Sequence, residues 1–194
     1  MDILSSIIAG FGLSAPAGLN AWIPLFAAGL AHKFQLFNFK LNAPFDMLAE
    51  TWVLIAVGIL LFIEIFADKI PAIDTVNDMI HTVIRPAAGG ILFAGHSGVV
   101  SSIDPTMAFI LGLLAAGSVH AVKATSRPII TATTGGIGNP IVSMLEDIIA
   151  IIATAMAIIV PVVAAVMMAL ILLVAFYVVW RWRARRRRRK AAEI

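Results

Sequence analysis

The stretch IVSMLEDIIAIIATAMAIIVPVVAAVMMALILLVAFYVVW, residues 141–180, decides the fold class. It is apolar almost throughout, its only acids are Glu146 and Asp147 near its start, and Pro161 lies in its middle. A single helix of this length would measure about 60 Å, about twice the thickness of the hydrocarbon core of a membrane. We therefore predict two membrane spans, residues 141–160 and 161–180, that turn near Pro161. One long kinked helix is the alternative, because no polar turn marks the junction.

The overall composition agrees with a membrane protein. The 194 residues are 61% hydrophobic and 13% charged, whereas a soluble domain is nearer half apolar and a quarter charged. No segment is polar enough to form a separate soluble domain, so residues 1–180 are expected to form one helical membrane domain. The chain has no cysteine, which excludes disulfides, thiolate metal sites and thiol nucleophiles.

Further apolar segments precede the long run. Residues 3–31 predict a first span that is broken at SAPAGLN, residues 14–20. The other predicted segments are a second span (51–67), a short amphipathic helix (70–84), a thin span or re-entrant segment (87–100) and a further span (103–122). The mixed segments 32–50 and 125–140 are expected to be loops, the first of them at the membrane interface. The sequence thus predicts about six spans.

Two of the predicted helices carry the same charged pattern, with polar residues at i, i+3 and i+7 followed by Arg-Pro. The residues are Asp78, His81, Arg85 and Pro86 in the first copy and His120, Lys123, Arg127 and Pro128 in the second. This spacing places the polar side chains on one face of a helix. Both Arg-Pro pairs are expected to end their helices, because a proline disfavours the α conformation of the preceding residue.

The basic residues are distributed unevenly. Eight of the fourteen Lys and Arg residues lie in RWRARRRRRK, residues 181–190. Directly after an apolar span, the tail 181–194 is typical of a cytoplasmic segment that faces anionic lipid, and nucleic-acid binding is not expected. Six spans place four cations on the side of the tail and two on the other side: Lys69, Arg85, Lys123 and Arg127, against Lys33 and Lys40. The positive-inside rule therefore favours six spans with both termini in the cytoplasm.

On this topology most ionisable groups collect near the cytoplasmic boundary of the membrane. The candidate pathway for an ion or solute consists of Asn20, Glu64, Asp68, Asp74, Asp78, His81, Arg85, His120, Lys123, Arg127, Asn139, Glu146 and Asp147. Carboxylates there would attract a cation or relay protons, and the cations would balance them or hold an anion. The alternative is structural, with arginines at helix ends paired to the acids as salt bridges.

Two further features bear on function. The segments SAPAGLN (14–20) and GGIGNP (135–140) each combine helix breakers with an Asn, as in transporters that coordinate a solute on unwound backbone; tight turns and close helix packing are the alternative. His81, His96 and His120 would have to converge from separate helices to bind a metal, so no metal or cofactor is predicted. Neither a P-loop nor a GxSxG motif is present.

Several of these motifs, in this order, resemble a known family. They are SAPAGLN (14–20); Glu64, Asp68, Pro71 and Asp74; Arg85, Pro86 and Gly89; His120, Lys123, Arg127 and Pro128; and Gly138, Asn139, Pro140, Ser143, Glu146 and Asp147. Over about residues 3–173 the chain resembles the bacterial integral-membrane family catalogued as domain of unknown function 4126. The resemblance implies a small multi-span protein of the bacterial cytoplasmic (inner) membrane. It implies no agreed activity, so it assigns no functional residues, and the Arg-rich tail lies outside it.

The sequence therefore predicts an all-α polytopic membrane protein. The leading functional hypothesis is a small transporter or channel-like protein that moves an ion or small polar solute through a charged pocket. The alternatives are a structural or scaffold membrane protein with a salt-bridged cluster and a membrane enzyme that acts on a lipid head group. One copy has limited room for a pathway, so a homodimer is among the expected arrangements.

Overall fold

The computed structural model describes residues 3–67, 71–96 and 103–160, together with residues 170, 173–174, 176–177 and 180–181. Side chains are described from residue 7 onward within these ranges, except for residues 71–76 and 78. The described residues form six α-helices and three short 3-10 helices and contain no β-strand, which confirms the all-α prediction.

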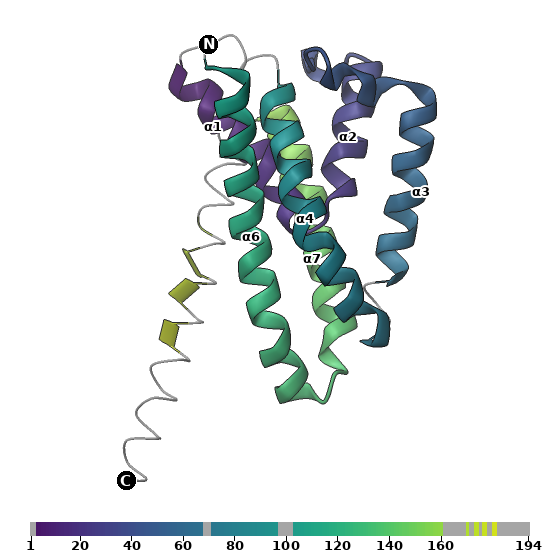
Figure 1. Cartoon of the computed structure of the whole chain (residues 1–194), viewed down its shortest axis with the longest axis vertical. Helices are drawn as coiled ribbons and strands as arrows, with labels where there is room; N and C mark the ends of the chain where they lie inside the picture. The colour runs from purple at the N-terminus through teal and green to yellow at the C-terminus, as the bar shows by residue number, and fades with distance from the viewer. Residues whose placement is uncertain are drawn as a thin grey trace.

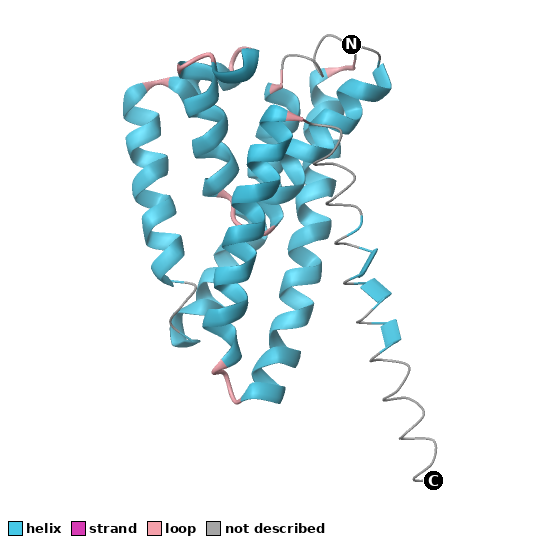
Figure 2. Cartoon of the chain, turned by 180° about the vertical axis from the view of Figure 1, so that it is seen from behind, coloured by secondary structure: helices cyan, strands magenta, loops and turns pink. Residues whose placement is uncertain are grey.

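Four long helices run side by side along the bundle, and each is antiparallel to the one before it (Figures 1 and 2). They are α3 (Thr51–Ala67), α4 (Pro71–Gly95), α6 (Pro105–Thr134) and α7 (Gly138–Ile159). By length and composition, α6 and α7 are long and apolar enough to cross a membrane. Helix α7 ends just before Pro161, while the turn predicted there, most of the predicted last span and the tail 182–194 lie outside the described residues.

The predicted break in the first apolar segment is present, but the two halves do not form one crossing. Helix α1 (Ile3–Ser14) and the 3-10 turn η1 (Ala15–Gly18) lead to the middle of the bundle, and α2 (Trp22–Lys33) returns to the end where α1 begins (Figure 1). Contacts along the hairpin agree with this course. The ring of Phe11 meets Phe93 near the end of α4, at 5.1 Å between centroids, whereas Gly18 lies against Ala116 near the middle of α6. The segment 3–31 therefore enters and leaves the bundle at the same end, and for this reason we call it the re-entrant hairpin.

Neither Arg-Pro pair ends a helix. Helix α4 continues through Pro86 and ends at Gly95, so up to Gly95 the described parts of the two segments predicted at 70–84 and 87–100 belong to one helix. Helix α6 continues through Pro128 to Thr134, and the predicted loop 125–140 shrinks to residues 135–137. A proline removes one backbone hydrogen bond, but packing on neighbouring helices offsets this local cost. Helix α6 ends instead at Gly135, whose φ of 62° is the left-handed conformation that often ends helices.

The segment between α2 and α3 covers one end of the bundle. It contains the 3-10 helices η2 (Leu36–Asn38) and η3 (Phe45–Ala49). Within this segment the side chains of Phe39 and Leu41 are buried, whereas those of Phe34 and Phe37 are exposed. The segment therefore packs on the helices with one set of apolar side chains and presents another set outward.

Helices α4 and α6 approach each other closely where they cross at two glycines. A side-chain carbon placed at Gly112 would overlap the carbonyl oxygen of Gly89, and one placed at Gly89 would overlap Ala116. Small residues at such crossings let two helix backbones approach closely. This contact fixes the position of α6 relative to α4 along the helix axes. It therefore also fixes which of their charged residues meet.

Gly112→Ala is expected to destabilise the protein by about 1–3 kcal/mol, because the added methyl group has no space at the crossing. The matched control is Gly117→Ala on the same helix, where the added carbon would lie 3.7 Å from the Pro86 ring in ordinary contact. The control should be neutral or stabilising, because alanine favours helix over glycine. Thermal unfolding in detergent micelles measures both, and equal melting temperatures for the two variants would contradict this packing.

Candidate functional site

A first group of polar side chains, buried except for one exposed threonine, joins α3, α4 and α6. It consists of Glu64, His81, Thr82, Arg85 and His120, and we call it the Glu64 group. Arg85 Nη2 donates to Glu64 Oε1 at 3.0 Å, and Arg85 Nη1 lies 3.0 Å from His120 Nδ1. The side chains of Glu64 and Arg85 are 1% and 0% exposed, so this ion pair is removed from the surface of the bundle.

The partners of the two histidines determine where their protons lie. A guanidinium can only donate, so Nδ1 of His120 accepts from Arg85 and its Nε2 donates to Thr82 Oγ1 at 3.2 Å. His120 is therefore neutral. Nδ1 of His81 lies 2.8 Å from the carbonyl of Asn77 and must donate to it, while Nε2 faces Glu64 Oε1 at 3.4 Å. That second contact is attractive only when a further proton lies on Nε2 or on the carboxyl group.

A second group joins α6 and α7 to the break in the re-entrant hairpin. It consists of Asn20, Lys123, Arg127, Ser143, Glu146 and Asp147, and we call it the Glu146 group. Glu146 Oε2 accepts from Arg127 Nη2 at 2.6 Å and lies 3.1 Å from Lys123 Nζ. Arg127 also donates to Ser143 Oγ at 2.8 Å. One carboxylate is thus shared by two cations.

The break in the hairpin contributes both backbone and side chain to the Glu146 group. The carbonyl of Leu19 accepts a hydrogen bond from Lys123 Nζ at 3.1 Å. Asn20 Oδ1 accepts from the first two amides of α2, and its Nδ2 donates to Asp147 Oδ1 at 3.0 Å. An Asn at this place caps the helix start that the break creates. The sequence SAPAGLN therefore places an unwound carbonyl and an amide beside buried charges.

The charges of the two groups balance. Among the described side chains, the cations Arg85, Lys123 and Arg127 are matched by three carboxylates, Glu64, Glu146 and Asp147. All six are at most 9% exposed. A buried ion without a partner would cost several kcal/mol, so this pairing is a condition for the bundle to close.

The two groups lie within the length of the helices, and not at helix ends as the sequence suggested. His120 is halfway along α6, and Arg85 lies more than half of the way along α4. Glu146 lies about two turns inside α7, because that helix begins at Gly138, so the helix dipole does not explain its position. His120 and Lys123 are one turn apart on α6, which brings the two groups next to each other.

The other predicted pathway residues have different outcomes. Asn139 is buried and donates to Thr131 Oγ1 at 3.0 Å at the far end of α6 and α7. Asp68 and the side chains of Asp74 and Asp78 lie outside the described residues. His96 lies beside Phe39 at the end of α4, away from both groups. Within the described residues no group of three or more His, Cys, Asp or Glu side chains gathers as metal ligands.

Sequence reasoning did not select two exposed hydroxyl residues that bond to buried candidate residues, Thr82 to His120 and Thr131 to Asn139. Thr82 lies one turn before Arg85, and Thr131 lies one turn after Arg127, on the same helix faces. Their spacing from the arginines was the available signal. The carbonyl of Leu19 had no signal of its own, because any residue can supply a backbone oxygen at a helix break.

Comparison with protein families identifies the chain. The model of a family described as a domain of unknown function (DUF4126) matches residues 7–181. The chain therefore belongs to this family, which confirms the resemblance seen in the motifs. Comparison with curated proteins and with solved structures found no match.

Breaking the Glu64–Arg85 pair on one side is expected to destabilise the protein strongly. Glu64→Leu or Arg85→Leu alone should cost about 3–5 kcal/mol, because each leaves a buried charge without its partner. The double variant should recover much of this loss, since an apolar pair needs no neutralisation. Thermal unfolding in micelles gives the coupling, and a double variant as unstable as the sum of the two single changes would show that the pair is not coupled.

Proposed function

We propose that this protein is a multi-pass protein of the bacterial inner membrane and that it acts as a small transporter or channel-like protein for an ion or small polar solute. The observation that carries the proposal is an apolar outer surface around a buried, charged interior at which a broken helix ends.

The distribution of side chains supports the membrane location. Of the 17 residues of α3 only Leu54, Val57 and Glu64 are buried. Its exposed side chains are large and apolar, namely Trp52, Ile55, Ile59, Leu60, Phe62, Ile63 and Phe66. Helices α6 and α7 expose further apolar side chains, including Met107, Ile110, Leu114, Ile141, Met144, Leu145, Ile148, Ile151 and Ile152. Water-soluble monomers rarely expose contiguous apolar surface of this extent, whereas a bilayer favours it.

The interior supports transport. Ionisable residues inside a membrane protein are costly, and they commonly mark paths for ions or protons. Here such residues come together with the unwound carbonyl of Leu19 at the end of two half-helices. Half-helices that meet near mid-membrane form the solute sites of several transporter classes.

The geometry suggests how charge would move through this site. A proton that enters the His81–Glu64 pair weakens the hold of Glu64 on Arg85, because a neutral carboxyl group attracts the guanidinium less than a carboxylate does. At Glu146 an entering cation would compete with Lys123 and Arg127 for the same oxygen. The pathway would run from Glu64 and His81 past His120 to Lys123, Arg127 and Glu146, with Asn20 at the break. Asp68 and Asp78 are its further predicted members.

Single-cysteine labelling tests the membrane topology without background, because the chain has no cysteine. The re-entrant hairpin predicts that Ser5→Cys and Asn38→Cys react with a membrane-impermeant thiol reagent from the same side. Ile137→Cys, in the turn between α6 and α7, should react only from the other side. Six spans with both termini in the cytoplasm would instead place Ser5→Cys with Ile137→Cys, and that result would refute the hairpin.

Transport is tested in proteoliposomes with an imposed pH gradient and a pH-sensitive dye inside. The wild-type protein should dissipate the gradient, whereas Glu64→Gln and His81→Gln should reduce the flux at least tenfold because the proton site is lost. Glu50→Gln is the control: it neutralises an exposed acid at the start of α3 and should leave flux unchanged. All variants are compared at a temperature at which circular dichroism shows them folded. A wild-type protein that moves neither protons nor Na⁺, K⁺ or Cl⁻ would contradict the proposal.

A second candidate function, a structural membrane protein, has one observation in its favour. The three described buried cations and three carboxylates neutralise each other, as in a salt-bridged lattice. If Glu64→Gln lowers the melting temperature but flux through the folded variant equals that of the wild type, this structural role replaces transport.

A further inference from the structure

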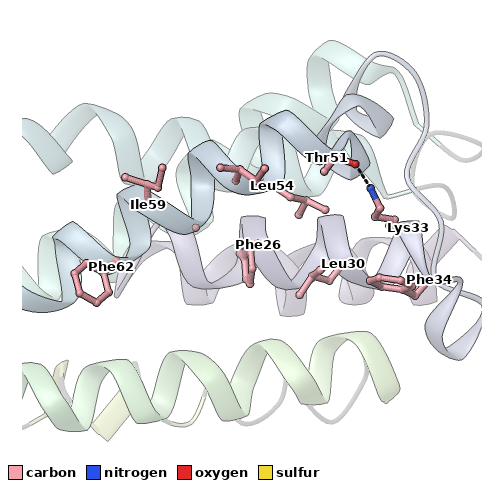
Figure 3. A pocket seen from close by; sticks show the side chains of 10 residues that line it. Phe26, Leu30, Lys33, Phe34, Thr51, Leu54, Ile59 and Phe62 are labelled. Atoms are coloured by element: carbon pink, nitrogen blue, oxygen red, sulfur yellow. Dashed lines mark hydrogen bonds between the residues drawn. The ribbon is translucent and has the colours of Figure 1, made fainter.

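We propose that the groove between α2 and α3 is a binding site for one phospholipid with an anionic head group. This inference uses the membrane location proposed above, but not the transport activity. Figure 3 shows the groove. Its volume is about 460 Å³, and the charged groups described above do not line it.

The groove has an apolar floor. Phe26 and Leu30 of α2 face Leu54, Ile59 and Phe62 of α3 along its length (Figure 3). It runs from Thr51 to Phe62, which is about 16 Å along a helix and close to the depth of one leaflet of the hydrocarbon core. An acyl chain of a lipid in that leaflet therefore matches the groove in both polarity and length.

A second groove adjoins the first. It has a volume of about 400 Å³, it lies between α2, α3 and α7, and Phe26 and Leu30 line both grooves. Its lining is also apolar apart from Thr154. Two neighbouring apolar grooves that meet at one helix suit the two acyl chains of a phospholipid better than a single-chain ligand.

Lys33 supplies the charge complementarity that selects the head group. It lies at the end of the first groove, where its Nζ donates to Thr51 Oγ1 at 2.6 Å and to the carbonyl of Ala49 at 3.2 Å (Figure 3). Both of these acceptors are neutral, and within the described residues no carboxylate lies within 4.0 Å of Lys33, although Asp46 and Glu50 are on the neighbouring segment. An ammonium group that is held in place without a counter-charge suits a phosphate.

The surroundings of Lys33 agree with the depth of a head group. Lys33 ends α2 at the end of the bundle that the segment 34–50 covers. Phe34 and Phe37 are exposed beside it, at 63% and 64%. Aromatic side chains next to a Lys are typical of the boundary between the hydrocarbon core and the head groups. The apolar grooves then extend from this boundary toward the middle of the bilayer.

The test counts lipids bound to the full chain. Protein is purified from mixed micelles that contain equal amounts of phosphatidylglycerol and phosphatidylcholine, and retained lipids are counted by native mass spectrometry. The wild-type protein should retain about fivefold more phosphatidylglycerol, the preference that one Lys gives at an anionic surface. Lys33→Gln should abolish this preference, and Lys33→Arg should keep it. Lys40→Gln makes the same charge change on an exposed Lys that does not line either groove, and should also keep it.

A second pair of variants tests the groove itself. Gly58→Leu should lower the number of bound lipids of both kinds at least threefold, because the added side chain enters the groove beside Phe26. Leu114→Phe enlarges an exposed side chain of α6 outside the grooves and should change nothing. Circular dichroism checks that the variants are folded, namely Lys33→Gln, Lys33→Arg, Lys40→Gln and Gly58→Leu.

Three results would overturn the proposal. The first is equal retention of the two lipids by the wild-type protein, and the second is an unchanged preference in Lys33→Gln. The third is a dimer in micelles that Gly58→Leu dissociates without any loss of bound lipid, which would assign the groove to a second copy of the chain. None of these measurements depends on flux, so the proposal of a lipid site can be refuted without refuting the proposal of transport, and the reverse is also true.

Discussion

The need to neutralise Arg85 inside the bundle organises the structure. A guanidinium that is 0% exposed is stable only beside an anion, and Glu64 is that anion. Helix α3 buries few other side chains, and this ion pair links it to α4. The same requirement operates between α6 and α7, where Lys123 and Arg127 share Glu146. Two electrostatic contacts therefore position α3 against α4 and α7 against α6.

The distribution of apolar and charged side chains is the reverse of that in a typical soluble protein. Large apolar side chains such as Phe62, Ile110 and Ile151 are outside, and Lys123 and Glu146 are inside. In a bilayer the exposure of apolar side chains to lipid carries no free-energy penalty, whereas every ion in the interior needs a partner. A site of this kind can respond to a proton or an ion, because one added charge changes several pairings at once. The contact between His81 Nε2 and Glu64 Oε1 is the clearest place for such a change.

The re-entrant hairpin links this interior to the edge of the bundle. Its break places Leu19 and Asn20 against Lys123 and Asp147, and its second half, α2, lines the two apolar grooves. One short helix thus touches the charged interior at its start and carries Lys33 at its end. A lipid bound along α2 would lie against the same helix that begins at the proposed pathway. Such a lipid would give the bilayer a physical route to influence the interior.

Local features that depend on composition and residue spacing were predictable from the sequence. The apolar runs predicted helices, SAPAGLN predicted a break, and the spacing of His81 and Arg85, and of His120, Lys123 and Arg127, predicted shared faces. Most of the described candidate residues do meet, because buried charges in an apolar chain have few partners other than each other. The effect of Pro86 and Pro128 was not predictable, since a local preference to end a helix was outweighed by packing between helices.

Composition and residue spacing were enough to predict an apolar helical chain with a break between Ser14 and Asn20. Three features became visible only in the folded chain: the broken segment turns back, Glu64 pairs with Arg85 while Asp147 pairs with Asn20, and Lys33 lies at the end of a groove. Helix formation and polarity are properties of neighbouring residues, whereas the pairing of charges depends on where helices cross. That crossing is set by close contacts such as Gly89 against Gly112, which residue spacing along one helix does not reveal.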